Sequence, residues 1–274
     1  MTGIYVDPTL REEIVLHLVR NYGPAAGRHA LILAITGPTG EGKTFQIDAV
    51  LDDLGVMAHR IESGELESEL AGQPAERIRL GYLRAGSRDE MAALVINDLD
   101  TGLGEWGSLV QYTVNRQAVF GQLMALCDSP TLVNNQPCSR VPIIVTGNDF
   151  TRLYGPLTRA GRMRTFPWRP SLEQRIPIIR TLFPWLGEEE SGEIASVYPH
   201  EPVAFWAAVA GAVDDTAVLA AIRCTGEQRA LKEARSGRSV RVNYAEIGVS
   251  EVLATAELVA VRSDHQNFLA EGMD

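Results

Sequence analysis

The chain has few cysteines and no excess of positive charge. Its 274 residues include three cysteines, Cys127, Cys138 and Cys224, an odd number without C-x-x-C spacing. This pattern argues against structural disulfides and against a zinc site, and it indicates a reducing cytoplasm. The net charge of −10 disfavours a broad basic surface for duplex nucleic acid, so we expect no nucleic-acid partner.

Long apolar runs and a secretory signal are also missing. No apolar run approaches the roughly 20 residues that span a bilayer, so we expect no membrane association and a cytoplasmic protein. The first residues, Met1 to Asp7, lack the basic segment and apolar core of a signal peptide. The composition, 45% hydrophobic and 22% charged, suits one large globular domain or two modest ones.

The strongest motif is a glycine-rich loop that follows the apolar run Leu31–Thr36. Residues 37–44 read GPTGEGKT and fit the pattern G-x-x-x-x-G-K-[ST]. A strand that leads through such a turn into a helix directs several backbone N–H groups at one spot, which makes an anion site. We expect Lys43 to reach the β- and γ-phosphates of ATP and Thr44 to bind Mg²⁺. The alternative is an ordinary turn between a strand and a helix.

Hydrophobic periodicity divides the chain near residue 170. Before it, strands alternate with helices, which indicates a mostly parallel sheet of five strands flanked by helices. The predicted strands are 31–36, 56–61, 91–98, 141–146 and 164–168, and the predicted helices are 10–20, 43–54, 74–85 and 111–126. After it, only helices are predicted, at 172–182, 203–213, 216–235 and 250–270. We therefore predict an α/β nucleotide-binding subdomain (residues 1–170) and a small all-α lid subdomain (residues 171–274).

Polar residues follow two of the predicted strands. The run Leu94–Asp98 has the form of a Walker B strand, and we expect Asp98 to belong to the magnesium shell. The alternative for Asp98 is a helix-capping or turn acid, and Asp100 either shares its role or belongs to the next loop. Asn148 follows the fourth strand, where its amide would orient the attacking water, although Gly-Asn-Asp is also a common turn sequence.

Two arginines, Arg159 and Arg162, lie three residues apart. At helical spacing they would share one face. They are either part of a solvated face or arginine fingers, which reach the γ-phosphate bound by a neighbouring subunit and stabilise the charge of the transition state.

Several long stretches together resemble the AAA+ core of the green-type Rubisco activase family. They include residues 40–46 (GEGKTFQ), 63–75 (SGELES…AGQPA), 96–100 (INDLD), 140–150 (RVPIIVTGNDF) and 159–163 (RAGRM). The likeness covers roughly residues 30–170 and continues more weakly through the helical part. The nucleotide-binding residues that it implies are Gly37, Pro38, Thr39, Gly40, Glu41, Gly42, Lys43, Thr44 and Phe45.

The resemblance implies a homo-oligomeric ring, a hexamer, with ATP and Mg²⁺ bound between subunits. Asn148 is then the sensor 1 residue, and Arg159 and Arg162 are the fingers from the next subunit. The implied reaction is ATP hydrolysis that remodels inhibited Rubisco and releases its tightly bound sugar phosphates. Loops that face the ring pore would engage this partner, and the resemblance favours such a role for the glycine-rich loop that carries Trp106; the alternative is a Trp106 side chain folded back onto its own domain.

The chain departs from the family in three places. Only about thirty residues precede the phosphate-loop strand, so we expect the N-terminal Rubisco-binding domain to be missing. Val209 and Gly211 stand where the family has its sensor 2 arginines, with Arg223 as a nearby substitute, and residues 226–242 align poorly. Two alternatives follow: an AAA+ ATPase of the same fold that remodels another protein, and a nucleotide-gated scaffold with little turnover.

Overall fold

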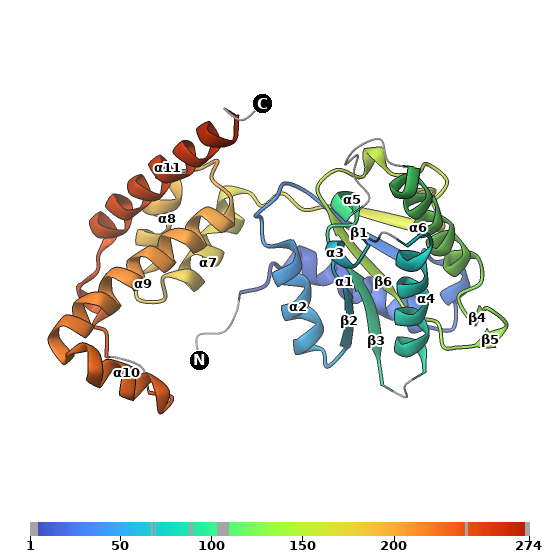
Figure 1. Ribbon diagram of the computed structural model, residues 1–274, viewed down its shortest axis with the longest axis horizontal. Coiled ribbons are helices and arrows are strands. Elements are labelled where there is room, and N and C mark those ends of the chain that lie inside the picture. Colours follow the sequence, from blue (N-terminus) through green and yellow to red (C-terminus); the bar gives the residue numbers. More distant parts are fainter. Residues whose placement is uncertain are drawn as a thin grey trace. The chain divides into compact units, whose positions relative to one another are not determined.

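The computed structural model describes residues 5–66, 68, 70–87, 90–102, 110–238 and 241–271 (Figure 1). The chain folds into two compact units, and the boundary between them lies between Arg169 and Pro170. We call residues 6–169 the α/β unit and the residues from Pro170 onward the helical unit.

The α/β unit is built on a parallel sheet with the strand order β2-β3-β6-β1-β7. Its strands are β1 Ile32–Thr36, β2 Met57–Ile61, β3 Ala92–Ile96, β6 Ile143–Gly147 and β7 Met163–Pro167. Every residue of β3 and β6 is buried, as expected of strands that helices cover on both faces. The predicted five-stranded parallel sheet is confirmed, and each predicted strand overlaps an observed one.

Helices cover both faces of this sheet (Figure 1). On one face α4 packs against α6, and on the other α1 packs against α2. The helices are α1 Pro8–Tyr22, α2 Lys43–Asp53, α3 Ser63–Leu66, α4 Gln73–Gly86, α5 Leu99–Gly102 and α6 Val110–Asp128, with 3₁₀ turns η1 Ala26–Arg28 and η2 Phe150–Arg152. Ile78, Tyr82 and Leu123 belong to the same buried core as Leu94 and Ile143 of the sheet.

A short antiparallel hairpin between α6 and β6 was not among the predicted elements. Its strands, β4 Leu132–Val133 and β5 Gln136–Pro137, are joined by Asn134 and Asn135 with φ of 49° and 61°. Two successive residues with positive φ are the mark of a two-residue hairpin turn, and Asn tolerates that conformation better than most residues. The Asn-Asn pair was therefore the available signal.

A buried histidine ties α1 to the sheet. His17 is 3% exposed, and its Nε2 donates to the carbonyl of Ile143, the first residue of β6, at 3.1 Å. Its Nδ1 lies 3.3 Å from the amide nitrogen of Asn21, which also donates to the carbonyl of Ala30. Burial lowers the pKa of His17 to about 4, so the ring is neutral near pH 7.

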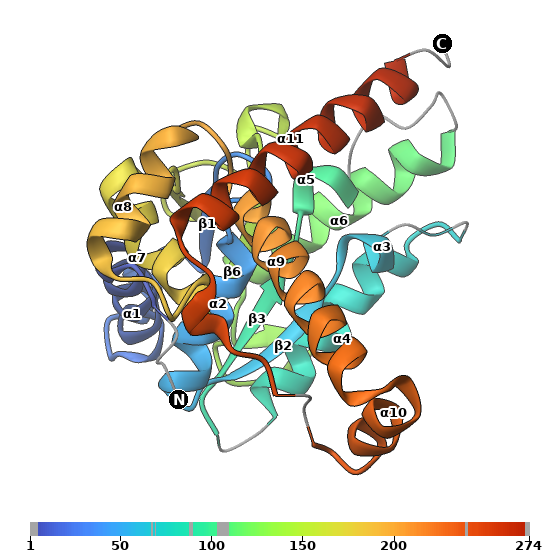
Figure 2. The same ribbon diagram turned by 90° about the vertical axis from the view of Figure 1, so that its left-hand side faces the viewer.

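The helical unit consists of helices around an aromatic core. They are α7 Leu172–Leu182, α8 Glu188–Val197, α9 Val203–Thr225, α10 Glu227–Arg235 and α11 Val249–Glu271, with the 3₁₀ turn η3 Tyr244–Glu246. α11 runs beside α9 (Figures 1 and 2), and Phe183, Phe205 and Trp206 pack edge to face in the core. The predicted helix break near Asp214 is wrong, because α9 continues to Thr225 and ends at Gly226, whose φ of 88° favours glycine.

One helix corrects the expectation about apolar runs. Helix α9 has 23 residues, and its most apolar window has a mean hydropathy of 1.5, so by length and composition it could cross a membrane. Buried core helices of soluble proteins pass the same test; Trp206, Val209 and Val213 of α9 lie in the core of the helical unit, and 22% of the apolar window is buried. A single helix of this kind is weak evidence for a membrane span.

Candidate functional site

The loop between β1 and α2 has the backbone geometry of an anion site. Gly40 and Gly42 have φ of 79° and 74°, in the left-handed region that favours glycine. Gly42 caps the N-terminus of α2 without a side-chain hydrogen bond, so the first N–H groups of the helix are not taken by a cap. A phosphate group fits such a helix end because the N–H groups and the helix dipole both favour negative charge.

Trp168 holds this loop in place, although we did not predict a role for it in the site. Its backbone N–H donates to the carbonyl of Thr36 at 2.6 Å, and its indole Nε1 donates to the carbonyl of Glu41 at 2.8 Å. A side chain at Gly37 would place its Cβ only 1.8 Å from the carbonyl oxygen of Trp168, so only glycine fits there. The available signal was a tryptophan directly after the edge strand β7.

Lys43 lies against the loop with its charge well satisfied. It is 6% exposed, and its Nζ donates to the carbonyls of Gly37 and Pro38 at 2.7 and 2.9 Å. A third bond, of 3.2 Å, joins Nζ to Oδ1 of Asn148. The pKa of Lys43 lies below its usual value, because the effect of burial outweighs that of the nearby carboxylates of Asp98, Asp100 and Glu41, which raise it. The structure thus brings together the predicted phosphate lysine and the predicted sensor amide.

At the end of β3, Asn97 contacts the hydroxyl that we expect to bind Mg²⁺. Oγ1 of Thr44 donates to Oδ1 of Asn97 at 3.4 Å. Nδ2 of Asn97 in turn donates to both carboxylate oxygens of Glu62, at 3.0 and 3.2 Å. The hydrogen-bond partner of Thr44 is therefore Asn97, and the role of Asp98 stays a prediction.

Asp98 has an unusual backbone. Its φ of 47° lies in the left-handed region, which costs a non-glycine residue about 1 kcal/mol. The conformation is held in part because the Asp98 N–H donates to Oγ1 of the buried Thr146 at 2.9 Å. Such strain is commonly kept at functional sites, where it aims a side chain.

Asp100 positions the loop that carries Asn148. Its Oδ2 accepts the backbone N–H groups of Asn148 and Asp149 at 2.7 and 2.8 Å. Its Oδ1 is buried without a hydrogen-bond partner in the part of the chain that the structure describes. Of the two roles that the sequence left open for Asp100, these contacts favour support of the neighbouring strand end.

The two arginines lie at the opposite edge of the sheet. The carbonyl of Arg162 accepts the N–H of Ile32 at 3.1 Å, so the turn that contains them is anchored where β1 begins, whereas the phosphate loop follows its end. Five residues of parallel strand separate the two edges by roughly 15 Å or more. The arginines also share no helix, because Gly161, with φ of 98°, forms a turn between them.

Their surroundings differ. Nε and Nη2 of Arg162 form a bidentate pair with Asp128 at 3.0 and 2.8 Å, and Nη1 donates to the carbonyl of Pro156 at 2.9 Å. The guanidinium of Arg162 is therefore held by Asp128, whereas Arg159 is exposed to solvent.

The other predicted residues are placed as follows. Phe45 is 55% exposed on the first turn of α2. Val209 is fully buried in the core of the helical unit, and Gly211 faces open space. Arg223 lies twelve residues beyond Gly211, roughly 18 Å along α9, so it does not occupy the same place on the helix. Trp106 lies outside the described residues.

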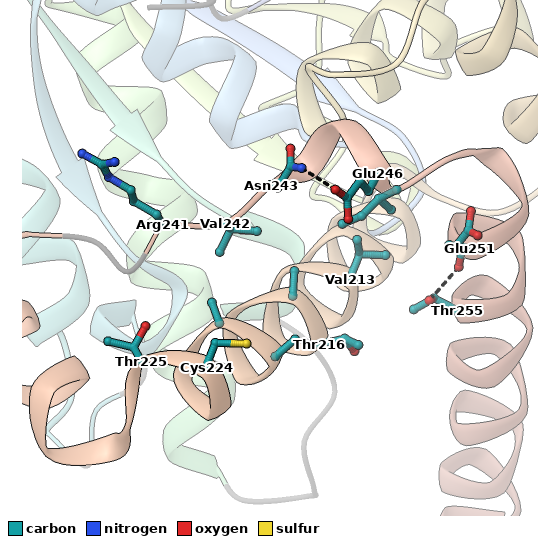
Figure 3. A pocket seen from close by; sticks show the side chains of 14 residues that line it. Val213, Thr216, Cys224, Thr225, Arg241, Val242, Asn243, Glu246, Glu251 and Thr255 are labelled. Atoms are coloured by element: carbon teal, nitrogen blue, oxygen red, sulfur yellow. Dashed lines mark hydrogen bonds between the residues drawn. The ribbon is translucent and has the colours of Figure 1, made fainter.

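The helical unit has a groove of its own, with a volume of about 570 Å³ (Figure 3). Its walls include Val213, Ala217 and Cys224 of α9, and Arg241 and Glu246 lie on the segment that crosses it. Glu246 accepts a hydrogen bond from Asn243 at 2.7 Å. The groove combines apolar walls with a few polar groups, which differs from the backbone cradle of the phosphate loop.

Within the described part of the chain, no group of three or more His, Cys, Asp or Glu side chains could hold a metal ion by itself. Mg²⁺ suits the site nonetheless, because it binds through one or two protein oxygens together with phosphates and water. Thr44 Oγ1 and the Asp98 carboxylate are the oxygens that we predict for this role.

Comparison with known proteins agrees with this geometry. The sequence model of the ATPase family associated with various cellular activities (AAA) matches residues 33–170. The chain is similar to ribulose bisphosphate carboxylase/oxygenase (Rubisco) activases from Vigna radiata var. radiata, Nostoc sp. and Hordeum vulgare. The identities are 39%, 38% and 37%, over 79%, 82% and 89% of this chain and 52%, 58% and 55% of those proteins. The resemblance to Rubisco activases is thereby confirmed, although the chain spans little more than half the length of these relatives.

A solved structure shares the fold. It is the AAA domain of FIGL-1 in complex with ADP, with a TM-score of 0.58 and 19% sequence identity, and the match covers 92% of this chain and 80% of that one. This likeness concerns the fold alone and agrees with the predicted α/β sheet followed by a helical region.

Proposed function

The chain belongs to the ATPase family associated with various cellular activities, and on that premise we propose that it hydrolyses ATP with Mg²⁺ to remodel Rubisco. The remodelling would free inhibited Rubisco of tightly bound sugar phosphates. The observation that carries the nucleotide part is the cradle formed by the left-handed Gly40 and Gly42 with Lys43 lying across it. The similarity to Rubisco activases supports the choice of partner.

In this proposal the loop binds the phosphates through its backbone N–H groups and Lys43. Bound Mg²⁺ would neutralise part of the phosphate charge. Thr44 and Asp98 are its protein partners, and the Asp98 carboxylate also polarises the attacking water. Asn148 orients that water through its amide, and Asp100 fixes the backbone of Asn148.

We further propose that Arg159 and Arg162 act on ATP bound by the next subunit of a homo-oligomeric ring, a hexamer. The support is their position, since they lie at the amino edge of the sheet and the phosphate loop lies at its carboxyl edge. One subunit then supplies the binding half and its neighbour supplies the charge that stabilises the transition state.

Remodelling of a different protein is the second candidate, and one observation favours it. Val209 and Gly211 replace the expected sensor 2 arginines, and a buried valine cannot contact a phosphate. A scaffold with little turnover is less consistent with the intact set of Lys43, Asp98 and Asn148. The chloroplastic location in the names of two relatives belongs to those proteins. For this chain a cytoplasmic location stays part of the proposal.

The test is recovery of carboxylation by Rubisco that has been inhibited with a sugar phosphate. We expect the protein with ATP to restore activity, and ADP or the Lys43→Ala variant to leave the enzyme inhibited. Steady ATP hydrolysis without recovery of any tested Rubisco would favour the second candidate. Tight ATP binding without phosphate release would favour the scaffold.

A further inference from the structure

The strand that ends at the nucleotide site carries an amide, Asn97, directly before Asp98. An amide is neutral and has two faces, because Oδ1 accepts hydrogen bonds and Nδ2 donates them. Which face meets Thr44 therefore matters for a metal site. If Oδ1 meets the hydroxyl, Thr44 donates its proton to Asn97 and keeps its oxygen lone pairs for a cation. If Nδ2 meets it, a lone pair is used up.

Glu62 fixes this choice. Both of its carboxylate oxygens accept from Nδ2 of Asn97, at 3.0 and 3.2 Å, and a carboxylate can only accept. The flipped amide would turn Oδ1 toward these oxygens, which is repulsive. With Nδ2 held by Glu62, Oδ1 faces the Thr44 hydroxyl at 3.4 Å.

The backbone keeps this chain of contacts in register. The N–H of Asn97 donates to the carbonyl of Ile61 at 3.0 Å, so Asn97 lies beside the residue that precedes Glu62. The N–H of Glu62 donates to Oε1 of Glu65 at 3.3 Å, and its carbonyl accepts the N–H of Glu65 at 2.9 Å. Asn97 is 3% exposed, which leaves its amide little freedom, whereas Glu62 is exposed.

We propose that Glu62 is a positioning residue for the Mg²⁺–nucleotide site, which orients the Asn97 amide so that Thr44 presents its oxygen to the cation. Glu62 also supplies, at hydrogen-bond distance from Nδ2, the negative charge that the Asn97 side chain lacks. The inference rests on the proposed nucleotide function. It predicts that Glu62 matters for the response to Mg²⁺ and not for binding of the nucleotide itself.

The first experiment is a Mg²⁺ titration of the affinity for a fluorescent ADP analogue, with a parallel measurement in EDTA. We expect Glu62→Ala to raise the Mg²⁺ concentration for half-maximal effect by about tenfold or more, as loss of outer-shell support of a metal ligand does. The isosteric Glu62→Gln keeps one acceptor oxygen for Nδ2 of Asn97 but loses the negative charge, so it should raise this concentration less than Glu62→Ala does. Affinity in EDTA should stay within about twofold of the wild type, because the phosphate cradle is untouched. The control is Glu76→Ala, an exposed acid-to-alanine change on α4 that should alter neither value.

The second experiment exchanges the two groups. Asn97→Asp alone places two carboxylates within hydrogen-bond distance, so it should weaken Mg²⁺-dependent binding at least as much as Glu62→Ala. The double variant Asn97→Asp with Glu62→Gln restores one donor opposite one carboxylate, and we expect it to recover most of the lost response. Thermal unfolding of each variant shows whether its fold is intact.

An unchanged Mg²⁺ response in both Glu62 variants would overturn the inference, as would equal losses with Mg²⁺ and in EDTA. Failure of the proposed function looks different, because the wild type would then bind the ADP analogue neither with Mg²⁺ nor without it.

Discussion

The two edges of the central sheet differ in how completely one chain satisfies their chemistry. At the carboxyl edge Lys43, Asn97 and Asn148 have hydrogen-bond partners that come from several strand ends of the same unit. At the amino edge Arg162 is held by Asp128 and Arg159 is exposed. The carboxyl edge therefore gathers the predicted binding residues of one chain, whereas we propose that the cations of the amino edge act on a nucleotide bound by the next subunit, for which Arg162 would have to leave Asp128.

The largest effect should come from the carboxyl edge. Lys43→Ala removes the cation from the phosphate cradle. We expect nucleotide affinity to fall at least 100-fold, because the two charged hydrogen bonds that Lys43 would donate to the bound phosphates are lost. ATP turnover should fall to background. Fluorescent-nucleotide binding and phosphate release measure the two losses. Lys232→Ala, which changes the only other lysine of the chain, is the matched control, and wild-type turnover in Lys43→Ala would remove the phosphate-loop assignment.

The next effect belongs to the amino edge and should separate binding from hydrolysis. In Arg159→Ala and Arg162→Ala we expect turnover in the assembled protein to fall about 1000-fold, since arginine fingers contribute on that scale. Nucleotide affinity should change little because the cradle lies at the other edge. Arg229→Ala, an exposed arginine of α10, is the control. Loss of nucleotide affinity equal to the loss of turnover would contradict the division between the edges.

A smaller effect concerns the support of the sensor loop. Asp100→Ala leaves the N–H groups of Asn148 and Asp149 without their acceptor, so the Asn148 amide should shift. We expect turnover to fall about 10- to 100-fold, as a displacement near 1 Å does, with nucleotide affinity within about threefold. Asp100→Asn keeps an acceptor oxygen and should recover part of the activity. A direct magnesium role predicts instead that Asn fails as badly as Ala.

The smallest effect at neutral pH concerns stability of the amino edge, where His17 donates to Ile143. The pKa of His17 is about 4 in the folded state and 6.5 in a free chain, so between these values the unfolded chain binds more protons. Its contribution is fully present above pH 6.5 and is lost as the pH falls toward 4, by about 3 kcal/mol in all. Urea unfolding at several pH values measures this loss. His17→Gln should flatten the dependence in this window, and an unchanged slope would show that other groups cause it.

The sequence was sufficient for those parts of the fold and site that depend on local patterns. The strand, the glycine turn and the helix from Lys43 are contiguous, so their geometry follows from residue order. The contacts of Asp100 with Asn148 and of Glu62 with Asn97 join residues 48 and 35 positions apart, and they depend on which strands are neighbours. The indole of Trp168 reaches Glu41 for the same reason. Spacing also misled at Arg159 and Arg162, because Gly161 replaces the expected helix with a turn.

The central claim, that the two edges of the sheet belong to one site only when two subunits meet, has a direct test. Lys43→Ala subunits retain the arginines, and Arg159→Ala/Arg162→Ala subunits retain the phosphate loop, so each kind is inactive alone. In a ring of head-to-tail contacts each interface needs an intact phosphate loop from one subunit and intact arginines from its neighbour. When the two kinds are mixed in equal amounts, each condition is met about half of the time, so about a quarter of the interfaces should be complete. Phosphate release should recover toward about a quarter of the wild-type rate. The rings must first be shown to contain both kinds of subunit. The account would then be contradicted if the mixture released no more phosphate than the sum of the two variants measured separately.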